Sequence, residues 1–123
     1  MYGLESKAIN IFALTIYNRS DTFSSMYTVK TLPEFDAWLD GLKDHITRLR
    51  LSRRLDKAQR GILGDVKSVG DGVFEMREFF GPGWRMYYVK RGDTLIIVLG
   101  GGSKGSQESD IATAQQRMAL LED

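Results

Sequence analysis

Cysteine is absent from this 123-residue chain, and His45 is its single histidine. Without cysteine the chain forms no disulfide, no thiolate metal site and no cysteine nucleophile, and one histidine excludes a histidine-rich metal cage. We therefore expect neither a metal nor another cofactor. The lack of disulfides fits a reducing compartment, so we expect a cytoplasmic protein.

Long apolar runs are missing as well. The two longest, residues 9–17 and 94–99, are far shorter than the roughly 20 residues that a membrane-spanning helix needs. Residues 1–25 do not resemble a signal peptide, because Glu5 precedes Lys7 and no small-x-small cleavage site follows. We therefore expect no membrane partner.

The charge of the chain is unevenly distributed, although the net charge is only +1. Residues 43–60 hold seven basic side chains against two acidic ones, a net charge of +5, whereas residues 106–123 hold one basic side chain against four acidic ones. A segregated basic segment is typical of proteins with an anionic partner. A solvated helix face would give the same pattern.

The chain divides at Met26. Residues 1–25 show little periodicity, whereas Met26 opens what reads as the first strand of a domain. We assign residues 1–25 to an N-terminal extension and residues 26–123 to one domain. Two interpretations of the extension stay open: translation begins at Met26, or residues 9–17 add a strand.

Two helices are predicted early in the domain, after a strand over residues 27–31. Pro33 suits the first turn of a helix, and an apolar stripe follows it at Phe35, Trp38, Leu39 and Leu42. A second helix is predicted over residues 44–60. Its candidate buried positions are Ile46, Leu49, Leu51, Leu55 and Ala58.

The second half of the domain reads as a meander of three strands and a last helix. We predict strands over residues 73–79, 84–90 and 94–99, flanked by glycine-rich loops over residues 61–72 and 100–105. Ser106 is the expected N-cap of the last helix. The resulting order, β-α-α-β-β-β-α, predicts an α+β fold with a small, mostly antiparallel sheet, an N-terminal helical hairpin and a C-terminal helix.

Basic and phenolic side chains interleave along the meander, at Lys67, Arg77, Arg85, Tyr87, Tyr88 and Lys104. Strand alternation points Tyr88 toward the core and places Arg85 and Tyr87 on the opposite face, which we expect to line an exposed groove. An odd-numbered loop around Gly81-Pro82-Gly83 would bring Arg77 beside Arg85, and an even-numbered loop would bring Glu78 there. Consistent burial of the apolar side chains favours the odd loop.

Two neighbouring arginines repel one another unless an anion lies between them. Guanidinium binds phosphate through two parallel hydrogen bonds, and glycine-rich loops like those that carry Lys67 and Lys104 can close over a ligand. We therefore predict a phosphodiester site formed by Arg85, Arg77, Lys67, Lys104 and Tyr87. Each residue also has a structural interpretation: an arginine paired with Glu75 or Glu78, a solvated lysine, an ordinary sheet tyrosine.

Several sequence blocks together resemble a known family. They are F-x-x-W-L-x-x-L-K-D (35–44), G-D-V-K-x-V-G-x-G-V-x-E-x-R (64–77), G-P-G-W-R-x-Y (81–87) and G-G-x-K-x-x-Q-x-x-D-I (101–111). In this order they are similar to the HigB-like "addiction module killer protein" branch of the RelE/ParE toxin superfamily, over residues 26 to about 120. The superfamily has the element order predicted above.

The resemblance implies the toxin of a bacterial type II toxin–antitoxin system. RelE-like members are ribosome-dependent mRNA endonucleases that need no metal and promote attack by the ribose 2′-OH, which leaves a 2′,3′-cyclic phosphate. The expected partners are mRNA on the ribosome and a helix-turn-helix, HigA-like antitoxin, through which the pair would reach operator DNA. The alternative is a non-nuclease toxin of the ParE kind, which binds DNA gyrase.

The resemblance also implies roles for single residues. Arg85 matches the strand arginine that stabilises the transition state, and Arg77 matches a basic residue near the phosphate. Lys104 lies where relatives place a late basic residue, and Lys67 and Tyr87 match the pattern of this branch. The chain departs from RelE at Glu75, where RelE has lysine, and it lacks the catalytic histidines of some HigB toxins.

Overall fold

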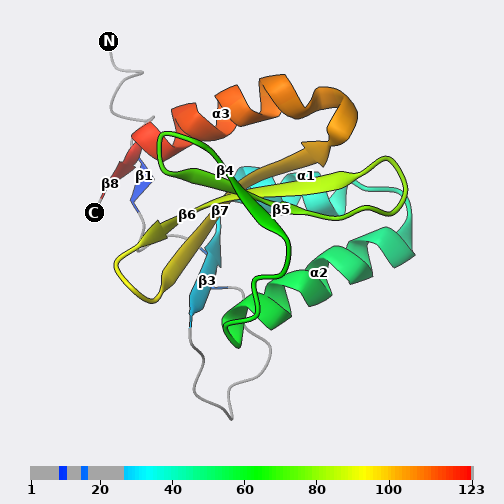
Figure 1. The fold of residues 1–123 in the computed structure, drawn as a ribbon, viewed down its shortest axis with the longest axis horizontal. Coiled ribbons are helices and arrows are strands. Elements are labelled where there is room, and N and C mark those ends of the chain that lie inside the picture. Colours follow the sequence, from blue (N-terminus) through cyan, green and yellow to red (C-terminus); the bar gives the residue numbers. More distant parts are fainter. Residues whose placement is uncertain (1–8, 11–14, 17–26, 123) are drawn as a thin grey trace.

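An α+β fold is formed by the residues that the computed structural model describes, which are 9–10, 15–16 and 27–122. Three α-helices and a mixed six-stranded sheet make up this fold (Figure 1), which confirms the predicted α+β class. The helices are α1 (Pro33–Asp40), α2 (His45–Gln59) and α3 (Gln107–Ala119). The sheet strands are β2 (Thr15–Ile16), β3 (Thr28–Thr31), β4 (Val66–Gly70), β5 (Val73–Arg77), β6 (Trp84–Arg91) and β7 (Leu95–Ser103).

The sheet runs in the order β2-β3-β7-β6-β5-β4, and the β3–β7 pair is parallel while all other neighbours are antiparallel. Helices α1 and α2 cover one face and α3 covers the other (Figure 1). Each face has its own apolar core. Met76 and Met86 pack with α1 and α2, whereas Val89 and Leu99 pack on the side of α3.

The two early helices begin where the sequence predicts. Pro33 opens α1, whose Phe35 is fully buried. Asp44 caps α2 by accepting a hydrogen bond from the Thr47 backbone N–H at 3.3 Å. Leu51, Leu55 and Ala58 are buried as predicted.

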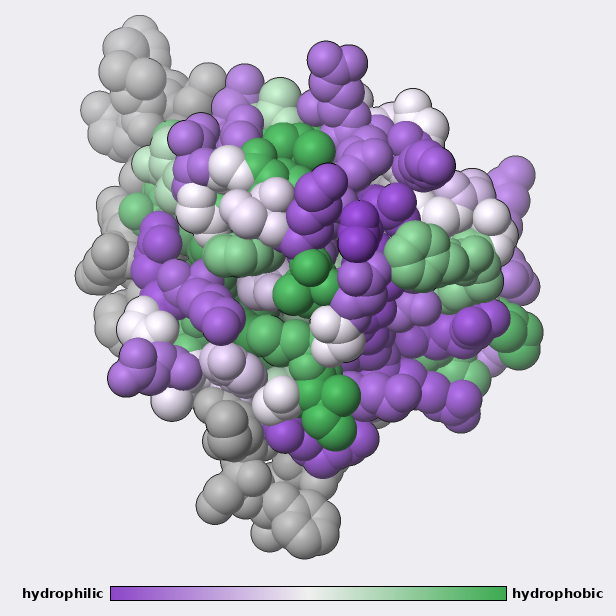
Figure 2. Space-filling view, viewed as in Figure 1, coloured by the Kyte–Doolittle hydropathy of each residue, from purple (hydrophilic) through white to green (hydrophobic). Residues whose placement is uncertain are grey.

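The burial predicted for Ile46 and Leu49 is wrong: they are 58% and 37% exposed. The buried stripe of α2 runs instead through Thr47, Leu51 and Leu55 at intervals of four residues. Ile46 and Leu49 lie off that stripe, because each residue turns the helix by about 100°. The outer face of α2 is otherwise mainly hydrophilic, and the lower right of Figure 2 is accordingly mostly purple with a few green atoms.

Two segments predicted as loops contain strands. Residues 61–72 include β4, which is paired with β5, so the observed order from residue 27 to the end of α3 is β-α-α-β-β-β-β-α, and the short strand β8 follows it. Residues 100–105 continue β7 as far as Ser103. A Cβ at Gly101 would lie 2.3 Å from the Trp38 ring, and one at Gly102 would overlap the Asp110 carboxylate. These glycines therefore serve close packing, and not a flexible loop.

The N-terminal extension is described at two short strands only. β1 (Ile9–Asn10) pairs in parallel with β8 (Leu121–Glu122), and β2 pairs with β3. The single strand proposed for residues 9–17 is thus represented by two separate two-residue strands, and residues 11–14 and 17 lie outside the described residues. The interpretation that translation begins at Met26 stays a prediction. Within residues 27–122, no helix is both long and apolar enough to cross a membrane.

Candidate functional site

Two rows of side chains lie across the β4-β5-β6-β7 part of the sheet, on the face that α3 covers. In the first row Arg77 on β5 is the direct cross-strand partner of Arg85 on β6, and Arg85 is in turn paired with Gly102 on β7. In the second row Lys67 is paired with Glu75, and Glu75 with Tyr87. The prediction that Arg77 lies beside Arg85 is therefore confirmed, and the loop between them is odd-numbered.

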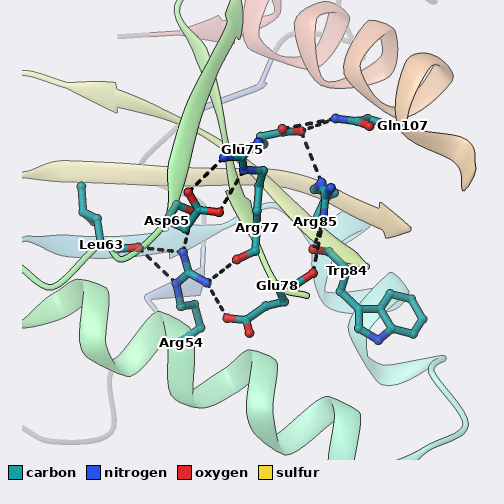
Figure 3. Close-up of polar contacts among 9 residues, drawn as sticks. All are labelled: Arg54, Leu63, Asp65, Glu75, Arg77, Glu78, Trp84, Arg85 and Gln107. Carbon is teal, nitrogen blue, oxygen red and sulfur yellow. Dashed lines mark hydrogen bonds and ion pairs between the residues drawn. The ribbon is translucent and has the colours of Figure 1, made fainter. Parts of the chain in front are cut away.

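Arg85 is almost completely buried, with a side chain 6% exposed, beside the equally buried carboxylate of Glu75 (Figure 3). The Arg85 Nε lies 3.8 Å from the nearer Glu75 oxygen, and Nη1 donates to the carbonyls of Glu78 and Trp84. The Gln107 side-chain amide, at the start of α3, donates to both Glu75 oxygens at 2.9 and 3.2 Å. The open groove expected around Arg85 is thus closed by α3 and filled by Glu75.

Arg77 is the more accessible arginine. Its side chain is 28% exposed and donates two hydrogen bonds of 3.0 Å to the Asp65 carboxylate (Figure 3). These hydrogen bonds lower the pKa of Asp65 below its usual value and raise the pKa of Arg77. An anion that binds Arg77 must therefore compete with Asp65, or bind the solvent-exposed side of the guanidinium while Asp65 stays in place.

Arg54 ties α2 to the sheet beneath this site. Its guanidinium donates to the backbone carbonyls of Leu63, Asp65 and Arg77 and forms an ion pair with Glu78 (Figure 3). The guanidinium group has five N–H donors in a fixed planar arrangement, so it can bind several acceptors at once. A lysine at position 54 could not replace these contacts. The sequence gives no local sign of this role, because Arg54 stands among many basic residues on one helix.

The loop between β5 and β6 exposes an aromatic ring next to both arginines. Phe79 is 74% exposed, and the guanidinium carbons of Arg77 and Arg85 lie 5.8 and 5.9 Å from its ring centroid. The next residue, Phe80, lies against Arg50 of α2, with the guanidinium carbon 3.7 Å from the ring centroid. Sequence reasoning missed Phe79, because the strand predicted over residues 73–79 included it, whereas β5 ends at Arg77.

The two predicted lysines lie at different places. Lys67 is exposed on β4, opposite Glu75, and not in a loop. Lys104 is exposed in the 3-10 turn before α3, and its backbone N–H donates to the Gly83 carbonyl at 2.8 Å. Lys104 therefore borders the loop between β5 and β6, whereas Lys67 lies at the edge strand.

Tyr87 is fully buried and does not line an open groove. Its hydroxyl finds no hydrogen-bond partner within the part of the chain that the structure describes. Burial raises the pKa of Tyr87 above its ordinary value, and the negative charges of Glu75 and Asp110 raise it further. The phenol therefore stays protonated at neutral pH, so it can donate a hydrogen bond but cannot act as a base.

The buried tyrosines make stability depend on pH at the alkaline end. Burial also raises the pKa of Tyr88 to about 12. A tyrosine whose pKa is raised on folding stabilises the fold below about pH 10, where the unfolded chain also keeps its proton. Above pH 10 the unfolded state ionises first, so the free energy of unfolding should fall by up to about 1.4 kcal/mol per pH unit for each tyrosine.

The substitution Tyr87→Phe tests this assignment. Urea unfolding at pH 9, 10 and 11 should show a pH slope about half as steep in the variant, because one of the two protons is gone. Stability at pH 7 should not fall, because the lost hydroxyl has no partner among the described residues. An unchanged alkaline slope would contradict the assignment.

The chemistry available at the site is cationic and aromatic. No group of three or more histidine, aspartate or glutamate side chains in the described ranges is arranged to hold a metal ion. The groups that could meet an anionic ligand are the Arg77 guanidinium, the exposed ammonium groups of Lys67 and Lys104, and the Phe79 ring.

Comparison with known proteins identifies a relative of this chain. No protein-family model matches the chain, and no solved structure matches it. A protein of Haemophilus influenzae named "Uncharacterized protein" is 40% identical over 87 residues, which cover 71% of this chain and 88% of that protein. The chain therefore belongs to the same family as this H. influenzae protein.

Proposed function

We propose that the chain is a toxin of a type II toxin–antitoxin system, in the HigB-like branch of the RelE/ParE superfamily, and that it cuts mRNA on the ribosome without a metal. The observation that carries the proposal is the direct cross-strand pairing of Arg77 with Arg85 beside the exposed ring of Phe79. Adjacent guanidiniums beside an aromatic surface suit a phosphodiester that is flanked by bases.

The proposed reaction is an internal transesterification of RNA. The 2′-OH attacks the neighbouring phosphorus and gives its proton to water, the bond from phosphorus to the 5′ oxygen breaks, and the leaving 5′ oxygen takes up a proton from water. The products are a 2′,3′-cyclic phosphate and a 5′-OH. Arg77 would bind the phosphate oxygens from the solvent side, while Arg85, deeper on the same row, adds positive potential where charge develops in the transition state.

Lys67 and Lys104 would complete the cationic surface. Lys67 is directly opposite Glu75, so it places an ammonium group on the row where RelE carries its own strand lysine. Lys104 stands at the other side, beside the loop that holds Phe79. An HigA-like antitoxin with a helix-turn-helix domain would mask this surface in the resting cell and take the pair to operator DNA.

One observation favours the second candidate, a ParE-like toxin that binds DNA gyrase. Arg85 is 5% exposed and its charge is opposed by Glu75, so the arginine that matches the catalytic one of relatives is not open to solvent. A binding toxin of the same fold would not need that arginine at its surface.

Arg77→Gln separates the two candidates without threatening the fold, because an exposed ion pair contributes little to stability. Removing one charge-stabilising donor should lower the cleavage rate by about 10²-fold. Primer extension on mRNA from induced cells should show cuts within translated codons for the wild type, and these cuts should largely disappear in the variant.

The matched control is Lys90→Gln, which removes an exposed charge at the opposite end of β6. This variant should cut as the wild type does. Wild-type cleavage by a folded Arg77→Gln protein would contradict the nuclease assignment. Gyrase-trapped DNA breaks without mRNA cuts would establish the alternative.

A further inference from the structure

A stripe of four cations follows one side of α2, from its exposed surface to its contact with the sheet. Arg50, Arg53, Arg54 and Lys57 recur at intervals of three and four residues, which places them on one side of the helix. Together with Glu78 they line an open hollow of about 210 Å³. In Figure 2 the hydrophilic surface of α2 lies directly below a light green patch over the loop between β5 and β6.

The charge in this hollow is not balanced. Its one carboxylate, Glu78, is paired with Arg54, which also holds three backbone carbonyls. The other cations of the stripe gain no carboxylate from the hollow, and Arg53 and Lys57 are exposed four residues apart. Like charges at this spacing destabilise a helix, and a bound anion would relieve the repulsion.

The loop between β5 and β6 connects this hollow to the arginine row on the other face of the sheet. Phe80 packs on Arg50, at the border of the hollow, and Phe79 lies beside Arg77 and Arg85. Glu78, which precedes both phenylalanines, lines the hollow itself. One continuous surface therefore runs from α2, over the exposed ring of Phe79, to Arg77.

The combination of a cationic track and an exposed ring selects one kind of ligand. Single-stranded nucleic acid has phosphates for the cations and free base faces for the ring, and base–aromatic stacking contributes substantially to the affinity of such complexes. A duplex offers the same phosphates, but its bases are already stacked and paired.

We propose that this surface binds a single-stranded nucleic acid, with phosphates in the α2 hollow and one unstacked base on Phe79. That the strand is RNA rests on the proposed function; the binding surface itself rests only on the arrangement of the cations and the ring. Phe79 is then the residue that distinguishes single strands from duplexes, and the α2 hollow is a phosphate site separate from the arginine row.

The first test is Phe79→Leu, measured by fluorescence anisotropy with a labelled 12-nucleotide single-stranded RNA and the full-length protein. Loss of one stacked base should weaken binding by about 10-fold and leave the salt dependence unchanged, because no charge is lost. Binding of inorganic polyphosphate, which has no bases, should not change. The matched control is Ile62→Ala, which removes another exposed apolar side chain.

The second test is the double variant Arg53→Gln/Lys57→Gln. Each phosphate contact contributes about 0.7 to the slope of log affinity against log salt for single strands, so the slope should fall by roughly 1.4. Polyphosphate binding should weaken as well. Lys90→Gln, which removes a charge outside the hollow, should leave the slope as it is.

Three results would contradict parts of this proposal. A Phe79→Leu protein that binds RNA as the wild type does, or a wild type that binds duplex RNA as tightly as single strands, would overturn the stacking role. An unchanged salt slope in the double variant would overturn the phosphate site. These measurements depend on binding alone, so they do not test the proposed nuclease function. That function would be contradicted separately, by the absence of mRNA cleavage.

Discussion

Replacing Arg85 with alanine is expected to lower the free energy of unfolding by about 3–5 kcal/mol, because the substitution leaves a buried charge without its partner. The Glu75 side chain is 1% exposed and would lose its ion pair with Arg85, while the Gln107 amide would still donate to it. Urea unfolding followed by circular dichroism measures the loss. Loss of activity in this variant would therefore mix a chemical effect with partial unfolding.

Neutralising Glu75 in the Arg85→Ala variant tests whether the unpaired carboxylate causes the loss of stability. In the double variant Glu75→Gln/Arg85→Ala the buried amide carries no charge, so at least half of the lost stability should return. The single variant Glu75→Gln should be less damaging than Arg85→Ala, because Arg85 keeps two backbone carbonyl partners. If the double variant were no more stable than Arg85→Ala, the ion pair would not be the source of the effect.

Gly101→Ala is the second substitution with a large expected effect. The added methyl group would lie 2.3 Å from the Trp38 ring, far inside van der Waals contact. That ring cannot move freely, because it packs against Phe35 at 5.7 Å and against Trp84 at 6.0 Å between ring centroids. We expect a loss of about 3 kcal/mol, the upper end of the range for overpacking a core.

Gly105→Ala is the matched control for this effect. Beyond its two chain neighbours, a Cβ at Gly105 would lie nearest to the Ser103 hydroxyl, at 3.7 Å, which is ordinary contact. Thermal or urea unfolding should place this variant within about 0.5 kcal/mol of the wild type. In a Trp38→Leu background, Gly101→Ala should cost much less, and an equal cost in both backgrounds would show that the ring is not responsible.

The pairing of Arg77 with Arg85 was predictable because it follows from local rules. Alternation sorts apolar and polar side chains along β5 and β6, and the requirement that Met76 and Met86 face one core fixes the parity of the loop. The helix starts at Pro33 and Asp44 were predictable for the same reason, since a cap is a property of neighbouring residues.

The burial of Arg85 and Tyr87 was not predictable from the strands alone. It depends on α3, which packs over that face and brings Gln107 to Glu75 across 32 residues of sequence. The loop predicted over residues 100–105 was wrong at the glycines of residues 100–102 for a similar reason. Their composition suggests a loop, whereas the partners that require them, Trp38 and Asp110, lie on two other elements, α1 and α3.

The hydrogen bonds of Arg54 have a consequence for recognition. They fasten α2 to the backbone of Arg77 and to the Glu78 side chain, so the helix and the strand end that leads to Phe79 and Phe80 are held in one rigid unit. A partner that touches both then meets a preorganised surface and loses little conformational entropy when it docks. Replacing Arg54 should not slow a chemical step directly, but it should weaken the binding of any partner that contacts both α2 and the loop between β5 and β6.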